Sequence, residues 1–295
     1  MGPVRVWLMS GPDIQHFYDE PTGSLSYIVS DPDTRYAAAI DPVLGFFPAS
    51  GRIDETPARA IAQYIRTNDL SLEWILETHA HADHLTAAQY LKSDLGGQVG
   101  IGTGICAVQR HFAEVFNLPA SFEADGRQFD RLFAGDDTFT IGSLECRVLD
   151  TPGHTNDSVS YLIKDAAFVG DSLFMCDYGT ARCDFPGGDA GQLYESIQTL
   201  FTLPGDTRLF MCHDYCPDGR ELRFECTVAE QKRKNVHVGN DASKDDFIRL
   251  REGRDATLDL PNLILPSIQV NIRAGRLPDP EDNQVSYIKI PVDLF

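Results

Sequence analysis

Residues 78–84 read THAHADH and place three histidines and an aspartate, His79, His81, Asp83 and His84, within six positions. Imidazole and carboxylate side chains are ligands for divalent ions such as Zn²⁺, Fe²⁺ and Mn²⁺. A polar loop that only caps the helix after it needs one or two such groups. The spacing therefore predicts that this loop forms one side of a metal centre.

Three further ligand-type residues, His154, Asp171 and His213, each follow an apolar run with the character of a β-strand. The runs are LEWILET before the histidine loop, a hairpin strand turned at Gly142-Ser143 before His154, a strand pair turned at Lys164-Asp165 before Asp171, and TRLFMC before His213. Loops at strand ends are where α/β proteins build their sites. We therefore expect the four segments to meet.

Other elements frame these strands. SLSYIVSD and YAAAIDP indicate two more strands. Residues 54–68 predict an amphipathic helix with Thr56 as N-cap and Pro57 at the first helical position, and residues 85–97 predict a helix that ends at Gly96-Gly97. Residues 1–238 are expected to form the catalytic domain. Residues 239–295 form an irregular extension packed on the same domain, in which only NLILPSIQVNI looks bound to the core.

Composition limits the classes of protein that are possible. The chain has 295 residues, 42% of them hydrophobic, which is enough to bury a substantial core. A net charge of −19 argues against a nucleic-acid backbone or an anionic membrane surface as the main partner. The N-terminus lacks a long apolar segment, and the seven cysteines include no CxxC pair. We expect a cytoplasmic protein with reduced thiols.

The sequence resembles the metallo-β-lactamase superfamily over about residues 20 to 235. The matching motifs are THAHADH, TPGHT around His154, VGDSLF around Asp171 and MCHDY around His213. The resemblance implies an α/β fold, an αββα sandwich of two mixed β-sheets packed face to face with helices outside. In binuclear members, the matching residues hold two ions. His79, His81 and His154 would hold one ion, Asp83, His84 and His213 the other, and Asp171 would bridge them.

Within the superfamily the chain is most similar to the persulfide dioxygenases, through ARCDF at 181–185, TLPGD at 202–206 and HDY at 213–215. That likeness implies a single Fe(II) held by His79, His154 and Asp171, with glutathione persulfide, or a related small persulfide, and O2 as substrates and sulfite as product. His81, Asp83, His84 and His213 then become groups that orient ligands or move protons. Family resemblance also suggests a homodimer.

Two residues are candidates for contacts with the substrate. Tyr215 matches a family residue expected to hydrogen-bond the substrate, and it joins Asp83 and His213 as a candidate catalytic residue. Arg182 could grip the glutathione moiety or hold the site loop, because guanidinium binds carboxylates bidentately. The alternative for Arg182 is a surface ion pair with Asp184.

Two other functions compete with oxidation of a persulfide. The full set of seven ligand residues could build a binuclear zinc site that hydrolyses a thioester, as in glyoxalase II. A non-catalytic metal-dependent module that binds or senses sulfur compounds is the third hypothesis. Such a module does not require a loop this rich in acid-base groups.

Overall fold

The computed structural model describes residues 11–294. The expectation for the extreme N-terminus falls on residues 1–10 and lies outside this range. Within the described range, no helix is long and apolar enough to cross a membrane. The seven cysteines all lie in this range, and none of them forms a disulfide there.

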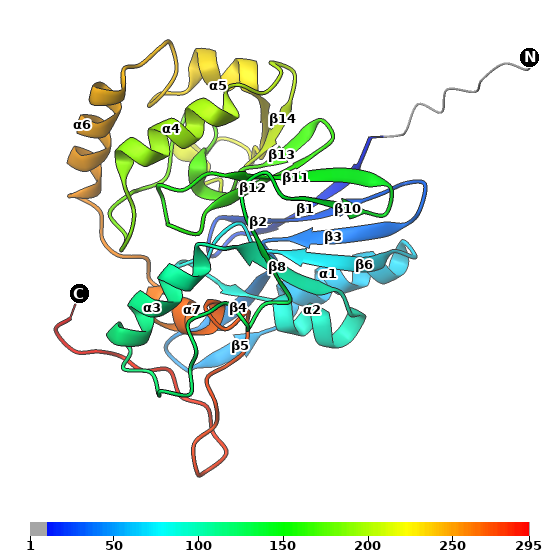
Figure 1. Ribbon diagram of the computed structural model, residues 1–295, viewed down its shortest axis with the longest axis vertical. Coiled ribbons are helices and arrows are strands. Elements are labelled where there is room, and N and C mark those ends of the chain that lie inside the picture. The colour runs from blue at the N-terminus through cyan, green and yellow to red at the C-terminus, as the bar shows by residue number, and fades with distance from the viewer. Residues whose placement is uncertain (1–10, 295) are drawn as a thin grey trace, which may run out of the picture.

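Two six-stranded sheets form the centre of the molecule (Figure 1). The first has the order β1 (Asp13–Asp19), β2 (Ser24–Ser30), β3 (Tyr36–Ile40), β6 (Ser71–Leu76), β8 (Gln98–Gly102) and β9 (Arg131–Phe133). The second runs in chain order from β10 (Thr138–Ile141) through β11 (Leu144–Asp150), β12 (Val159–Ile163), β13 (Ala166–Phe168) and β14 (Arg208–Phe210) to β15 (Glu225–Thr227). Both sheets contain parallel and antiparallel pairs. A small third sheet joins β5 (Arg52–Asp54), β4 (Val43–Phe47) and β7 (Leu85–Thr86).

The two large sheets pack face to face because their strands alternate apolar side chains between two faces. In β2, Leu25, Tyr27 and Val29 enter the core between the sheets, whereas Ile28 enters the core on the outer face. In the second sheet, Phe168 of β13 faces the first sheet, and Ala167 faces outward. Each sheet therefore needs a helical layer on its other side.

Helices supply both outer layers (Figure 1). Residues of α1 (Thr56–Thr67), α2 (Ala88–Leu95), α3 (Ile105–Val115) and α7 (Ile264–Asn271) pack on the first sheet. Residues of α4 (Ala190–Leu200), α5 (Val228–Lys234) and α6 (Lys244–Asp255) pack on the second. The expected αββα sandwich is confirmed. At α1 the cap differs from expectation, because the N-cap is Glu55 and Thr56 is already helical, with Asp54 accepting its N–H and hydroxyl.

The segment after residue 238 is more deeply embedded than its composition predicts. The apolar stretch that was expected to reach the core does so, and it forms helix α7. The expectation that nothing else there reaches the core is wrong, because α6 buries Phe247 against α4, with its ring 5.7 Å from that of Tyr194. The assignment of domain boundaries at 238 and 239 stays a prediction.

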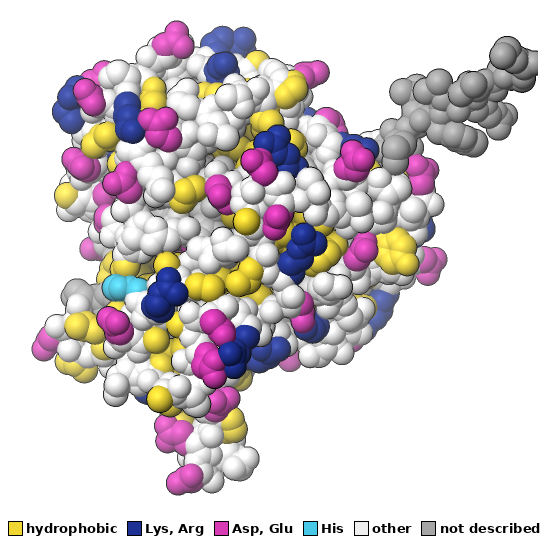
Figure 2. Space-filling view, viewed as in Figure 1, with side chains coloured by type: hydrophobic (Ala, Val, Ile, Leu, Met, Phe, Trp, Pro, Cys, Tyr) yellow, Lys and Arg dark blue, Asp and Glu magenta, His cyan; other side chains and the backbone are white. Residues whose placement is uncertain are grey.

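Charges of both signs are interspersed on the face that Figure 2 presents. Lysine and arginine side chains lie next to acidic ones there and form no continuous basic field.

Candidate metal centre and its pocket

The candidate ligands meet at one edge of the sandwich because strands of both sheets end there. β6 of the first sheet leads into the histidine loop. In the second sheet, β11 leads to His154, and β13 leads to Asp171 in a short 3-10 turn, Gly170–Ser172. His213 follows β14 and pairs with Ser24 at the start of β2 through an isolated bridge. Backbone hydrogen bonds around this bridge, such as Leu25 N–H to the Cys212 carbonyl, fasten the two sheets together beside the site.

The structure brings all seven predicted ligand residues together. Donor atoms of His79, His154 and Asp171 lie within 4.8 Å of one another, and so do those of His81, Asp83 and His84. His213 connects the groups, because its Nε2 lies 3.4 Å from a carboxylate oxygen of Asp83 and 3.4 Å from one of Asp171. The other Asp171 oxygen lies 3.5 Å from Nε2 of His154. Asp171 therefore stands between two histidines, where it can bind one ion or bridge two.

Each of the five histidines is held by one ring nitrogen and presents the other to the site. The holding partners are the Thr78 hydroxyl for His79, the Asp41 carboxylate for His81, the Leu85 carbonyl for His84, the Arg182 carbonyl for His154 and the Ser24 hydroxyl for His213. The opposite nitrogens of His79, His81, His84 and His213 are buried and have no hydrogen-bond partner among residues 11–294. Metal-binding histidines are held in this way, with the second nitrogen fixing the ring. The residues fit a divalent transition ion.

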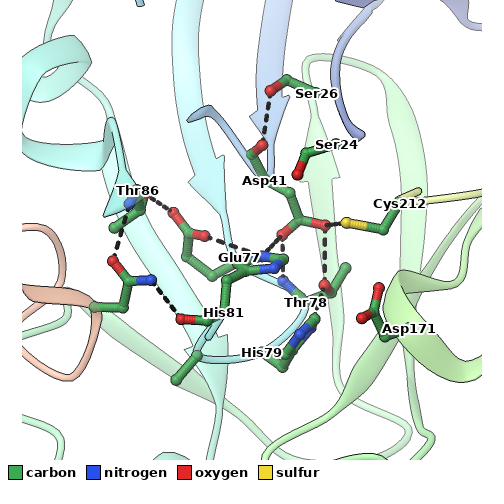
Figure 3. Close-up of polar contacts among 12 residues, drawn as sticks. Ser24, Ser26, Asp41, Glu77, Thr78, His79, His81, Thr86, Asp171 and Cys212 are labelled. Atoms are coloured by element: carbon green, nitrogen blue, oxygen red, sulfur yellow. Dashed lines mark hydrogen bonds and ion pairs between the residues drawn. The ribbon is translucent and has the colours of Figure 1, made fainter. Parts of the chain in front are cut away.

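A buried carboxylate network lies behind the histidine loop (Figure 3). Asp41 accepts hydrogen bonds from the Thr78 N–H at 2.7 Å, the Thr78 hydroxyl at 2.9 Å and His81 Nε2 at 3.0 Å. Glu77 lies 3.7 Å from the same His81 nitrogen and accepts a hydrogen bond from the Thr86 hydroxyl. This network fixes the first turn of the loop from the side away from the pocket.

Electrostatics divide the histidines into two kinds. Burial, followed by the neighbouring His81 and His154, lowers the pKa of His79 well below its usual value, and burial with His81 lowers the pKa of His84 to about 4. These two rings are neutral at pH 7 and offer lone pairs to a cation. Burial alone would also lower the pKa of His81, but Asp41 and Glu77 outweigh it and raise that pKa to about 10. The Asp41 carboxylate therefore holds the Nε2 proton of His81, and the Nδ1 atom is the one left for an ion.

A pocket of about 360 Å³ opens directly onto this centre. Asp83, His154 and Asp171 form its floor, and aromatic side chains such as Phe174, Tyr178 and Phe185 line its walls. Ligand pockets combine mostly apolar walls with a few polar groups that converge. The site can therefore hold a small molecule with one polar end at the metal ligands.

The structure locates the two predicted substrate contacts at this pocket in different settings. The Tyr215 ring stacks on His213 with a centroid distance of 5.5 Å and lines the pocket, and its hydroxyl bonds no other described residue. The Arg182 guanidinium instead binds Asp184 through two hydrogen bonds of 2.6 and 2.7 Å and the carbonyl of Asp259 at 2.6 Å. Arg182 thus holds the loop beside His154, and its contact with a substrate stays a prediction.

Several residues that build the site were missed at the sequence level. Asp41 and Asn271 carry most of the support of the histidine loop, and Asp157 accepts the Ala80 N–H at 2.7 Å. Asp41 had a signal, since it ends an apolar strand just as the metal-ligand candidates do. The single amide Asn271, far along the chain, had none.

The geometry of the site agrees with the protein family to which the sequence is similar. The family model of the metallo-beta-lactamase superfamily matches residues 20–213, and the chain belongs to this superfamily. That range begins before β2 and ends at His213, so it contains all seven candidate ligands.

Individual relatives cover nearly the whole chain. A probable metallo-hydrolase of Burkholderia pseudomallei is 48% identical over 292 residues, which is 96% of this chain and 99% of that protein. The human mitochondrial persulfide dioxygenase ETHE1 is 28% identical over 89% of this chain and 88% of its own. The crystal structure of ETHE1 from Myxococcus xanthus superposes with a TM-score of 0.72 at 31% identity, covering 90% of this chain and all of that one.

Proposed function

We propose that this protein is a persulfide dioxygenase that acts on glutathione persulfide or a related small persulfide. The reaction consumes the persulfide RSSH, O2 and water and yields the thiol RSH, sulfite and two protons. The outer sulfur loses four electrons, and O2 accepts them. The observation that carries the proposal is the cluster of His79, His154 and Asp171, whose donor atoms lie within 4.8 Å of one another and of which His154 and Asp171 line the pocket. The likeness to ETHE1 supports it.

His79, His154 and Asp171 would hold one Fe(II), since two imidazoles and one carboxylate are the ligands of non-haem iron oxygenases. When bound, the iron supplies a place where O2 and a sulfur atom can react side by side. The protein's own part is to hold the ligand rings rigidly and to position the persulfide between the aromatic walls. Asp83 and His213 lie 3.4 Å apart beside Asp171 and can pass on the protons that are released.

A binuclear zinc hydrolase that cleaves a thioester is the second candidate. The cluster of His81, Asp83 and His84 beside the first one favours it, as do the bridging position of Asp171 and the similarity to a probable metallo-hydrolase. In this case Asp83, His84 and His213 would hold a second ion. The role of these three residues therefore separates the two functions. Cytoplasmic location and a homodimeric state stay predictions in either case.

Oxygen uptake by the Fe(II)-loaded protein with freshly prepared glutathione persulfide tests the proposal. We expect uptake with an equal amount of sulfite, none with the Zn-loaded protein, and a loss of about a hundredfold or more in His79→Ala, because even residues that only support a metal ligand contribute ten- to a hundredfold.

The variant His84→Ala discriminates between the two candidates. A mononuclear oxygenase should keep its bound iron and a measurable part of its turnover in this variant. A binuclear hydrolase should lose its second metal together with thioester cleavage. Thioester hydrolysis by the Zn form, with no oxygen uptake by the Fe form for any small persulfide, would contradict the proposal.

A further inference from the structure

The C-terminal segment supplies one wall of the pocket. This wall is formed by Arg251 and Arg254 of α6 and by Leu258, Asp259, Pro261, Asn262 and Leu263. The family model ends at residue 213, so this wall lies outside the region that it describes. The side chains of this wall are therefore not set by the family model, and they can select the substrate.

Three arginines line the pocket, and two of them are already engaged. Arg182 binds Asp184 and the backbone of residues 258–259. Arg251 is buried and binds Asp255 at 2.7 and 3.0 Å and the Thr180 carbonyl at 2.8 Å. Arg254 is exposed to the pocket, and its guanidinium makes no hydrogen bond or ion pair with any residue of the described range. It is the cation among the three that is available to a ligand.

Arg254 is connected to the metal end of the pocket by neighbouring aromatic rings. Its guanidinium lies 5.8 Å from the ring centroid of Tyr178, that ring lies 5.0 Å from Tyr215, and Tyr215 lies 5.5 Å from His213. Two side chains therefore separate the free cation from a candidate ligand. An extended tripeptide spans about 10 Å, which is about two of these three steps.

We propose that Arg254 binds a carboxylate of the molecule that carries the persulfide sulfur, and that the C-terminal segment thereby selects anionic, peptide-like persulfides. This inference rests on the proposed function. A guanidinium fixed over an aromatic ring keeps its donors free for bidentate binding of a carboxylate. In a chain of net charge −19, a local cation is required to hold an anion.

Steady-state oxygen uptake by Arg254→Gln with two persulfides tests this contact. The Michaelis constant for glutathione persulfide should rise about tenfold to a hundredfold, the range for loss of a hydrogen bond to a charged group, at nearly constant kcat. With ethyl persulfide, which has no carboxylate, both constants should stay unchanged. Arg254→Lys should fall between wild type and Arg254→Gln. The matched control is Arg249→Gln, on the same helix, which removes only a surface ion pair with Asp246.

Binding of reduced glutathione to the metal-loaded protein, measured by calorimetry, gives a second readout that needs no turnover. Wild-type binding that is lost in Arg254→Gln and kept in Arg249→Gln supports the contact, even if the protein oxidises no persulfide and the proposed function fails. The contact would be overturned by a Michaelis constant for glutathione persulfide that does not change in Arg254→Gln, or by an equal rise of the Michaelis constant for ethyl persulfide. It would also be overturned if wild type binds no glutathione, or if Arg254→Gln binds it as well as wild type does.

Discussion

Asp31 is a single residue that joins the two sheets at a distance from the metal centre. It follows β2, is 1% exposed, and accepts hydrogen bonds from the Thr34 hydroxyl at 2.6 Å and from the N–H and hydroxyl of Ser143 at 2.7 Å each. Ser143 forms the turn between β10 and β11 of the second sheet. The carboxylate therefore ties an end of the first sheet to a turn of the second.

The ionisation of Asp31 should make stability depend on pH. Burial alone would raise its pKa, but the hydrogen bonds from Thr34 and Ser143 outweigh burial and lower the pKa from 3.8 to about 2. A carboxyl with a lowered folded pKa stabilises the protein above its unfolded pKa, and this contribution is lost as the pH falls from about 4 to 2. Asp31→Asn should therefore cost about 1 kcal/mol at pH 7, after allowance for solvent screening.

Urea unfolding of wild type and Asp31→Asn at pH 7 and pH 3 measures this effect. The difference in the free energy of unfolding should shrink at pH 3, because the carboxyl is then mostly protonated in the unfolded chain and begins to be protonated in the folded one. Glu145→Gln, an exposed position on β11 of the same hairpin, is the control and should change little at either pH. An equal difference for Asp31→Asn at both pH values would show that its charge is not what matters.

At the residue scale, ligand identity could be predicted and supporting contacts could not. Metal chemistry requires particular side chains at short spacing, so His79, His81, Asp83 and His84 were visible in the sequence. The partners of Arg182 include carbonyls at 258 and 259, which only folding brings near. Backbone carbonyls belong to every residue, so their use leaves no mark on the sequence.

At the scale of elements, helix α7 acts as a brace for the histidine loop. Asn271, its last residue, donates hydrogen bonds of 2.8 Å to the carbonyls of His81 and His84 and accepts one of 2.9 Å from the Thr86 N–H. The two carbonyls belong to the irregular histidine loop, and the N–H belongs to the end of β7. One side chain thus satisfies three buried polar groups around the metal ligands.

Replacing this amide should loosen the loop. Asn271→Leu leaves two carbonyls and one N–H without partners, and we expect a loss of about 2–4 kcal/mol in the free energy of unfolding. We also expect metal affinity to fall about tenfold to a hundredfold, because the ligands lose support from behind. Thermal unfolding and competition with a chelator measure the two effects. Asn283→Leu, which removes an exposed contact with Tyr287, is the control; unchanged metal affinity in Asn271→Leu would refute the brace.

Most strands, and the turns at 142–143 and 164–165, followed from local pattern, because alternation and turn residues act over a few positions. Helix α6 did not, because its sequence KDDFIRLREGRD is dominated by charge. Its buried positions are Phe247, Arg251 and Asp255, and the last two are buried as an ion pair. A pattern search that counts only apolar residues overlooks a helix held in this way.

At the scale of the whole molecule, the sandwich could be predicted only through family resemblance. Alternation of apolar and polar residues shows that a strand has two different faces, but it does not tell which sheet or helix packs on each face. The metal site depends on that arrangement, since the first sheet contributes the histidine loop and the second contributes His154, Asp171 and His213. The C-terminal segment then crosses both outer layers, with α6 over the second sheet and α7 against the first.

This crossing predicts that residues 1–238 do not form a stable domain alone. Truncation after 238 removes Phe247 from the outer core of the second sheet and Ile264, Ile268 and Ile272 from that of the first. Each such side chain contributes about 1.5–3 kcal/mol by burial, and a whole domain is stable by about 5–15 kcal/mol. The truncated chain should therefore show no cooperative thermal transition by circular dichroism. A chain that ends at residue 291, which loses the exposed residues 292–294 together with residue 295, should unfold like the full chain. Cooperative unfolding of the 1–238 chain within a few degrees of the full-length protein would instead make the C-terminal segment an accessory to a domain that is complete without it.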